Sequence, residues 1–149
     1  MQTIKIILLK SDVLAAIASN TSYTGTKTES ANPDEFYDRV ATVEKDAELL
    51  SLYWQDACAS LADALRTFIV EAKFGRETLT LTLEVSNSYD ATLTPAVETG
   101  ISAVVVAAMI SRWFRITMPQ RAAEWEKEAT RQFEALLANL YHRKKPVRK

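Results

Sequence analysis

The sequence predicts a mainly α-helical domain with a small antiparallel β element, an α+β fold. Three observations support this prediction. Only three glycines and four prolines occur in 149 residues, which favours long helices over a loop-rich β fold. Long stretches repeat apolar residues at helical spacing, whereas one short stretch alternates threonine with leucine. The length fits a single helical domain, expected at residues 1–142, with a basic tail at 143–149.

The N-terminal part is expected to combine a strand with short helices. Residues 3–9 are rich in isoleucine and predict a strand. Ser11 is a suitable N-cap for a short helix that runs to about Ser19. Residues 20–31 are rich in threonine, serine and asparagine and predict an exposed loop. A second short helix is expected to start at Asn32–Glu35, where asparagine caps and Pro33 fits the first turn.

Three principal helices are expected at about 43–72, 95–116 and 118–142. In the first, apolar residues recur every three or four positions, and Gly75 follows its expected end. The second opens with Thr94 and Pro95 and is apolar on nearly every side. The third has an apolar stripe opposite a charged face. Residues 77–86 predict a strand, whose partner is either the N-terminal strand or the same strand of a second subunit.

The basic residues are concentrated at the C-terminus. Residues 143–149 hold five of the 18 lysines and arginines, so the preceding residues carry 13 basic against 19 acidic side chains. This tail is either a solvated, frayed terminus or a contact for an acidic protein surface or a nucleic-acid backbone. With an acidic body, only weak, salt-dependent DNA contact through the tail is expected.

Residues suited to catalysis are scarce. One cysteine, Cys58, forbids an intramolecular disulfide and a multi-cysteine zinc site. One histidine, His142, excludes mechanisms that need two imidazoles. Three isolated glycines cannot form a phosphate-binding loop. The acidic pairs at 34–35 and 44–46 are typical of helix starts. We therefore expect a non-enzymatic protein with no cofactor and no metal.

The second principal helix predicts a partner. A chain with few helices has little material with which to cover a helix that is apolar all round, so a neighbouring subunit is expected to complete its core. Each tryptophan is either a core anchor or an interface anchor. The chain is thus expected to form a homo-oligomer. The residues expected to bind partners are Val105, Trp113 and Phe114 in this helix and Arg143, Lys144, Lys145, Arg148 and Lys149 in the tail.

No membrane segment is expected. The first ten residues lack a long apolar core and a small-residue cleavage site, unlike a signal peptide. The longest charge-free stretch lies between Glu98 and Arg112, and it is shorter than the roughly 18 residues that a span needs. We expect a cytoplasmic protein.

The order and composition of the helices resemble those of head–tail connector proteins, also called neck or head-completion proteins, of tailed bacteriophages and prophages. Three segments carry this resemblance. They are the acid-rich helix start at Asn32 followed by LLSLYWQDACASL at 49–61, the hydrophobic helix from Thr94 that closes with Arg112-Trp-Phe, and the amphipathic helix from AEWEKEA at 123–129 to LLANLY at 136–141 with its basic end. The strands at 3–9 and 77–86 depart from the simplest helical connectors.

The resemblance implies a structural subunit of a phage or prophage particle that forms a ring between the portal and the tail. Its partners would be further copies of itself and portal or tail proteins, and it would be found in the cytoplasm during assembly and then in the virion. The apolar helix and an exposed edge of the threonine–leucine strand are expected to mediate ring formation. The alternative is a helical adaptor or regulatory module of the host that docks through its tail.

Overall fold

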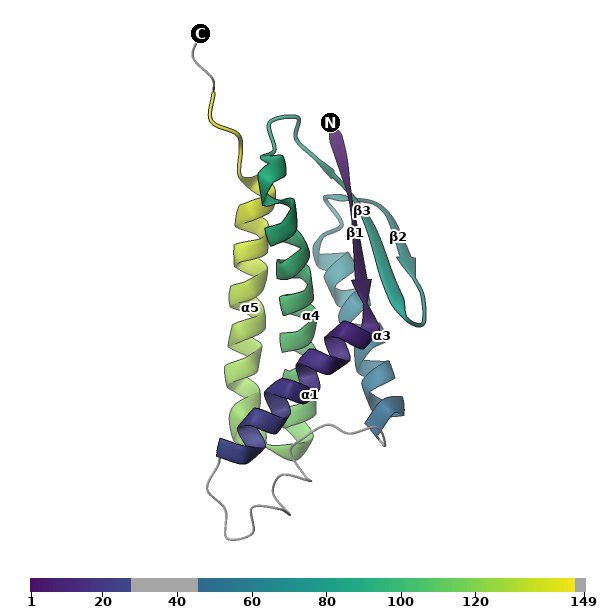
Figure 1. Cartoon of the computed structure of the whole chain (residues 1–149), viewed down its shortest axis with the longest axis vertical. Helices are drawn as coiled ribbons and strands as arrows, with labels where there is room; N and C mark the ends of the chain where they lie inside the picture. Colours follow the sequence, from purple (N-terminus) through teal and green to yellow (C-terminus); the bar gives the residue numbers. More distant parts are fainter. Residues whose placement is uncertain (28–45, 147–149) are drawn as a thin grey trace.

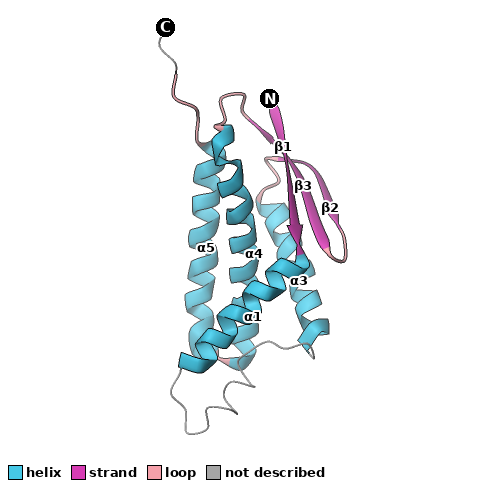
Figure 2. Ribbon diagram, viewed as in Figure 1, coloured by secondary structure: helices cyan, strands magenta, loops and turns pink. Residues whose placement is uncertain are grey.

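Helices dominate the structure, and a three-stranded sheet covers part of them (Figures 1 and 2). The computed structural model describes residues 1–27 and 46–146. Within these residues the chain forms, in order, β1 (Gln2–Leu9), α1 (Lys10–Lys27), α3 (Ala47–Ala64), β2 (Ile69–Phe74), β3 (Thr78–Val85), the short 3-10 helix η2 (Ala91–Leu93), α4 (Thr94–Thr117) and α5 (Pro119–Tyr141). This confirms the predicted fold class, mainly α with a small antiparallel β element.

The sheet has the order β1-β3-β2, and both pairs are antiparallel. β1 pairs with β3 along its whole length, from Gln2 opposite Val85 to Leu9 opposite Thr78. The leucines of β3 are buried, and its threonines lie on the other face, as the alternation predicts. The N-terminal strand is therefore the partner of β3, and a second subunit is not needed for this pairing.

The predicted long helix at 43–72 is wrong in its last part. α3 ends at Ala64, a turn follows, and the chain enters β2 at Ile69. The apolar residues from Leu65 to Ala72 continue the helical spacing, but Thr67, Ile69 and Val70 are β-branched and Phe68 is aromatic, which favours a strand. The backbone N–H of Glu84 donates to the Phe68 carbonyl at 2.6 Å, so β3 supplies the pairing that secures this choice. Gly75 lies in the hairpin turn between β2 and β3 rather than at a helix end.

The first helix is longer than predicted. α1 starts at Lys10 and continues through Lys27, so residues 20–27 of the predicted loop are helical. The polar side chains of Asn20 and Thr21 donate hydrogen bonds to the carbonyls of Ala16 and Ile17, one turn earlier. These hydrogen bonds satisfy the polar side chains within the helix, although asparagine and threonine residues in themselves favour a loop. The predicted helix start at Asn32–Glu35 lies outside the described residues.

α4 is the central element of the core. It packs against α1, α3, α5 and β1. Its bounds and those of α5 confirm the predicted second and third principal helices within a residue or two. Pro95 lies in the first turn of α4 as expected, although Thr94 is already helical and Leu93 occupies the cap position. Sequence-distant apolar side chains from β1, α3, β3 and α5 join those of α4 in one hydrophobic core.

Candidate interaction surfaces

The α4 residues expected to bind a partner are buried by their own chain. Val105, Trp113 and Phe114 are 1%, 5% and 0% exposed. Every residue from 101 to 114 is buried or partly buried, because helices α1, α3 and α5 and strand β1 pack against this stretch. The expectation that α4 exceeds what its own chain can cover is therefore wrong. The predicted helices alone offer too little cover, whereas in the structure strand β1 and the longer helix α1 also pack against α4.

By length and composition alone, the segment Ala91–Thr117 could cross a membrane. In the structure, however, its apolar side chains form the core, and its arginines reach carboxylates on neighbouring helices. Arg112 bonds Asp56 of α3 at 2.5 Å and stacks 4.6 Å from the ring centroid of Tyr53. Arg115 pairs with Glu126 of α5. These contacts connect α4 to α3 and to α5.

The threonine–leucine strand has no open edge. β3 lies in the middle of the sheet and is paired on both sides, so the expectation that its edge mediates ring formation is wrong. The two outer strands are β1 and β2. Strand order, which depends on pairing between distant segments, decides which backbone groups remain available to a partner.

The free edge of β1 can be assigned residue by residue. In an antiparallel pair, opposite residues alternate between those that exchange hydrogen bonds and those that do not. The backbone N–H of Lys10 donates to the Glu77 carbonyl at 2.8 Å, which makes the even-numbered residues of β1 the ones bonded to β3. The N–H and C=O groups of the odd-numbered residues therefore point away from the sheet. These residues are Thr3, Lys5, Ile7 and Leu9.

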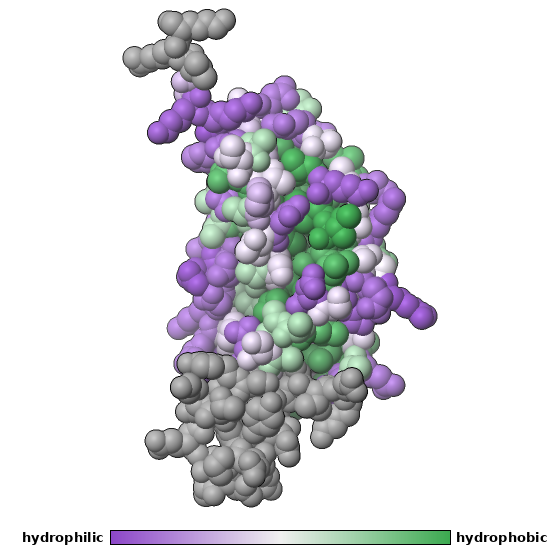
Figure 3. All heavy atoms as spheres, in the orientation of Figure 1, coloured by the Kyte–Doolittle hydropathy of each residue, from purple (hydrophilic) through white to green (hydrophobic). Residues whose placement is uncertain are grey.

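The side chains of the same four residues lie on the outer face of the sheet, and all four are exposed. Ile7 and Leu9 are 57% and 43% exposed, and Val70 and Phe74 of the other outer strand, β2, are exposed to a similar extent, 58% and 57%. Figure 3 shows a green hydrophobic patch over the position of β1. The edge of β1 thus combines unpaired backbone groups with exposed apolar side chains, the two features that mark an edge open to pairing.

The edge of β2 is less suited to pairing. Its register shifts between Ile69 and Glu71, so the strand is bulged at Val70. Glu71 and Lys73 lie side by side on this short strand, 3.6 Å apart at their charged groups. Bulges and charged side chains are common devices that protect sheet edges from unwanted pairing.

A groove of about 340 Å³ lies between α3 and the β2–β3 hairpin. Trp54 and Cys58 of α3 and Phe74 of β2 contribute to its wall, and Arg76 lies at the turn. Burial raises the pKa of the Cys58 thiol to about 12, so the thiol stays protonated near neutral pH. Cys58 is thus a buried, protonated thiol of the core.

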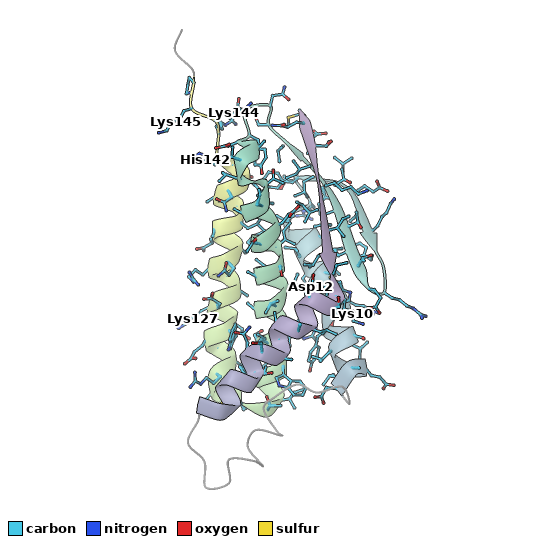
Figure 4. The ribbon with its side chains drawn as sticks, in the orientation of Figure 1. Lys10, Asp12, Lys127, His142, Lys144 and Lys145 are labelled. Carbon is cyan, nitrogen blue, oxygen red and sulfur yellow. The ribbon has the colours of Figure 1, made fainter. Side chains whose placement is uncertain are left out.

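The beginning of the basic tail is attached to the body (Figure 4). The Lys144 N–H donates to the Ser88 carbonyl at 2.7 Å, and the Arg143 guanidinium donates to the Ser86 hydroxyl at 3.2 Å. His142 Nε2 lies 3.9 Å from an oxygen of Asp90. The tail is therefore not frayed at its start. Lys145 is exposed, and Arg148 and Lys149 lie outside the described residues.

Hydrogen bonds hold the loop that receives the tail. The side-chain amide of Gln2 donates to the carbonyls of Ser86 and Tyr89, at 3.1 and 3.4 Å. Asp90 accepts hydrogen bonds from the hydroxyl and the backbone N–H of Thr92, which lowers the pKa of Asp90, and His142 and Lys144 add to this effect. Both ends of the described chain thus meet at the loop between β3 and η2.

Among residues 1–27 and 46–146, no group of three or more histidine, cysteine, aspartate or glutamate side chains is arranged to hold a metal ion. Comparisons with protein-family models, with curated proteins and with solved structures find no match for this chain.

Proposed function

We propose that this chain is a structural assembly subunit of a phage or prophage particle, similar to a head–tail connector, that acts through contacts between subunits rather than through chemistry. The observation that carries the proposal is the edge of β1, where the backbone groups of Thr3, Lys5 and Ile7 face away from β3 and the side chains of Ile7 and Leu9 are exposed. The resemblance in helix order and composition supplies the type of particle.

The contact surface differs from the one that the sequence suggested. The apolar helix is core and the threonine–leucine strand is central, so neither is available to a neighbour. The outer strand β1 replaces them in the proposal. Since an open edge accepts a strand from any suitable partner, this surface suits an assembly in which subunits dock by main-chain hydrogen bonds.

The test is to observe assembly directly. Sedimentation at tens of micromolar and negative-stain electron microscopy would be carried out on the chain alone and mixed with a portal protein. The proposal expects closed multimers in at least one of the two samples. A chain that stays monomeric in both would overturn it. Genes for terminase, portal or capsid proteins next to its own gene would support the assignment to a virion.

The attached tail favours a second candidate, a host adaptor that docks through its basic end. The tail leaves the body from a fixed point, and Lys145 is exposed there. Deleting 143–149 would also remove the contacts of Arg143 and Lys144 with the body, so the cleaner variant replaces only Lys145, Arg148 and Lys149 with alanine. Partner capture that survives this triple substitution would remove the support for the adaptor.

A further inference from the structure

We propose that the β1 edge accepts an extended segment of a partner subunit as a fourth strand, and that this segment places an acidic side chain beside Lys5. The inference deepens the proposed function and rests on it, because it names the contact through which the chain would assemble. It follows from the backbone groups of the edge, the side chains beside them, and the helices beneath them.

The backbone of β1 offers a regular row of donors and acceptors. The N–H and C=O groups of Thr3, Lys5 and Ile7 and the N–H of Leu9 face away from β3. The C=O of Leu9 lies at the start of α1 and accepts the first hydrogen bond of that helix. The register of β1 on β3 has no irregularity over its eight residues. An added strand can therefore pair with β1 from Thr3 to Ile7 without a register shift, which the bulged β2 does not allow.

The side chains of the edge specify the chemistry of the added strand. Ile7 and Leu9 are exposed on the outer face and need apolar neighbours. Lys5 lies between Thr3 and Ile7 on that face, opposite Thr82 of β3. No carboxylate of the described residues lies within ion-pair distance of Lys5. Glu84 of β3 lies only diagonally from Lys5, so an acidic residue directly opposite Lys5 on the added strand would be its nearest carboxylate.

The helices beneath the sheet favour a single segment over a second whole copy. α4 contacts β1, and α4 and α5 extend past the β1 edge of the sheet (Figure 1). If two copies joined by their β1 edges, the projecting helices of each would meet those of the other. An extended segment carries no helices and avoids this collision. The chain's own basic tail is a poor occupant, since its lysines and arginines would lie beside Lys5.

The test uses a capped peptide of alternating valine and threonine with a central glutamate, and a control peptide in which lysine replaces the glutamate. Backbone amide signals of the full chain are followed by nuclear magnetic resonance during titration and hydrogen exchange. We expect the glutamate peptide to slow exchange at the N–H groups of Lys5 and Ile7 while those of Ile4 and Ile6 stay unchanged. It should bind roughly fivefold to tenfold more tightly than the lysine peptide, as cross-strand charge pairs differ by this order.

Two variants keep the test decisive. In Lys5→Glu the preference between the two peptides should reverse, which a general hydrophobic association would not do. Ile7→Pro removes an N–H that faces away from β3, so the fold should persist as proline is tolerated at such edge positions, and peptide binding should be lost. If neither peptide protects Lys5 and Ile7 at millimolar concentration, the inference is wrong.

The outcomes separate this inference from the proposed function. If the chain without peptide protects the Lys5 and Ile7 amides more strongly as its concentration rises, the edges pair with each other, and the single-segment contact is wrong. If multimers form and the Ile7→Pro variant still assembles, the assembly role stands and the β1 contact fails. If the peptides bind in the expected order but no multimer forms with any partner, the edge is a binding site and the assembly role fails.

Discussion

The apolar segments α4 and β1 differ in how far the fold buries them. α4 has the longer apolar stretch, yet its residues from Ile101 to Phe114 are buried or partly buried, because four elements pack against it. β1 is only eight residues long, and half of its residues are exposed, among them Ile7 and Leu9. The difference arises from position in the fold. A segment in the centre of the helical layer is covered on most sides, whereas an outer strand of an open sheet keeps one edge and one face free.

The largest expected effect tests the buried side of this comparison. Phe114→Ala should lower the free energy of unfolding by about 3–5 kcal/mol, because it leaves a cavity where a fully buried ring packs near Trp125. Ile116→Ala is the matched control on the same helix, since Ile116 is 63% exposed, and it should change stability by less than about 0.5 kcal/mol. Urea denaturation measures both. Equal losses for the two variants would contradict the burial of α4 by its own chain.

Hydrogen exchange in the free protein tests whether the edge of β1 is open. The amides of Ile4, Ile6 and Leu8 bond to β3 and should exchange slowly, through large opening events. Those of Lys5, Ile7 and Leu9 face away from β3 and should exchange quickly. A period of two along β1 is the expected pattern. Uniform protection of the strand would show that its edge is covered.

A smaller effect is expected for the contacts that hold α4 to α3. Arg112 bonds Asp56 and stacks on Tyr53, but both partners of the ion pair are partly exposed. A double-mutant cycle of Arg112→Ala and Asp56→Ala should give a coupling energy of about 0.5–1 kcal/mol, measured by urea denaturation. A coupling near zero would mean that α4 is held by its apolar contacts alone.

The smallest effect is expected where the tail meets the body. The folded pKa of Asp90 lies below its ordinary value of 3.8, mainly because of the hydrogen bonds from Thr92. Its contribution to stability is therefore present above that value and is lost as the pH falls through the folded pKa. Asp90→Ala should lower the melting temperature slightly at pH 7, and the difference from the unsubstituted chain should shrink towards pH 3. A difference that is the same at both pH values would show that the carboxylate charge plays no part.

Local patterns in the sequence predicted the elements whose signals are strong. The alternation from Thr78 to Val85 predicted β3, and the Thr94-Pro95 start and the charged face of the last helix predicted α4 and α5. β2 was missed because Leu65, Phe68, Ile69 and Ala72 happen to continue the helical spacing of α3. Only pairing with β3, a contact between separate segments, selects the strand there.

The candidate surface could not be found from local patterns alone. The hydrophobicity of Val105, Trp113 and Phe114 predicted a contact, but hydrophobic residues serve the core and an interface equally well. The order β1-β3-β2 decides which strands are outermost, and the sequence of a single strand does not specify its pairing partner. One signal was present, since the run from Ile6 to Leu9 is apolar at four successive positions and so places apolar side chains on both faces of a strand.

The junction at Ser86 has a mechanical consequence. Gln2 donates to the carbonyl of this residue and Arg143 donates to its hydroxyl, so residues near both ends of the described chain are held to one turn. A pulling force applied between the termini would load this turn first and would peel its few hydrogen bonds one after another. The helical layer would come under tension only after these hydrogen bonds had broken, so the junction at Ser86 would open before the helices separate.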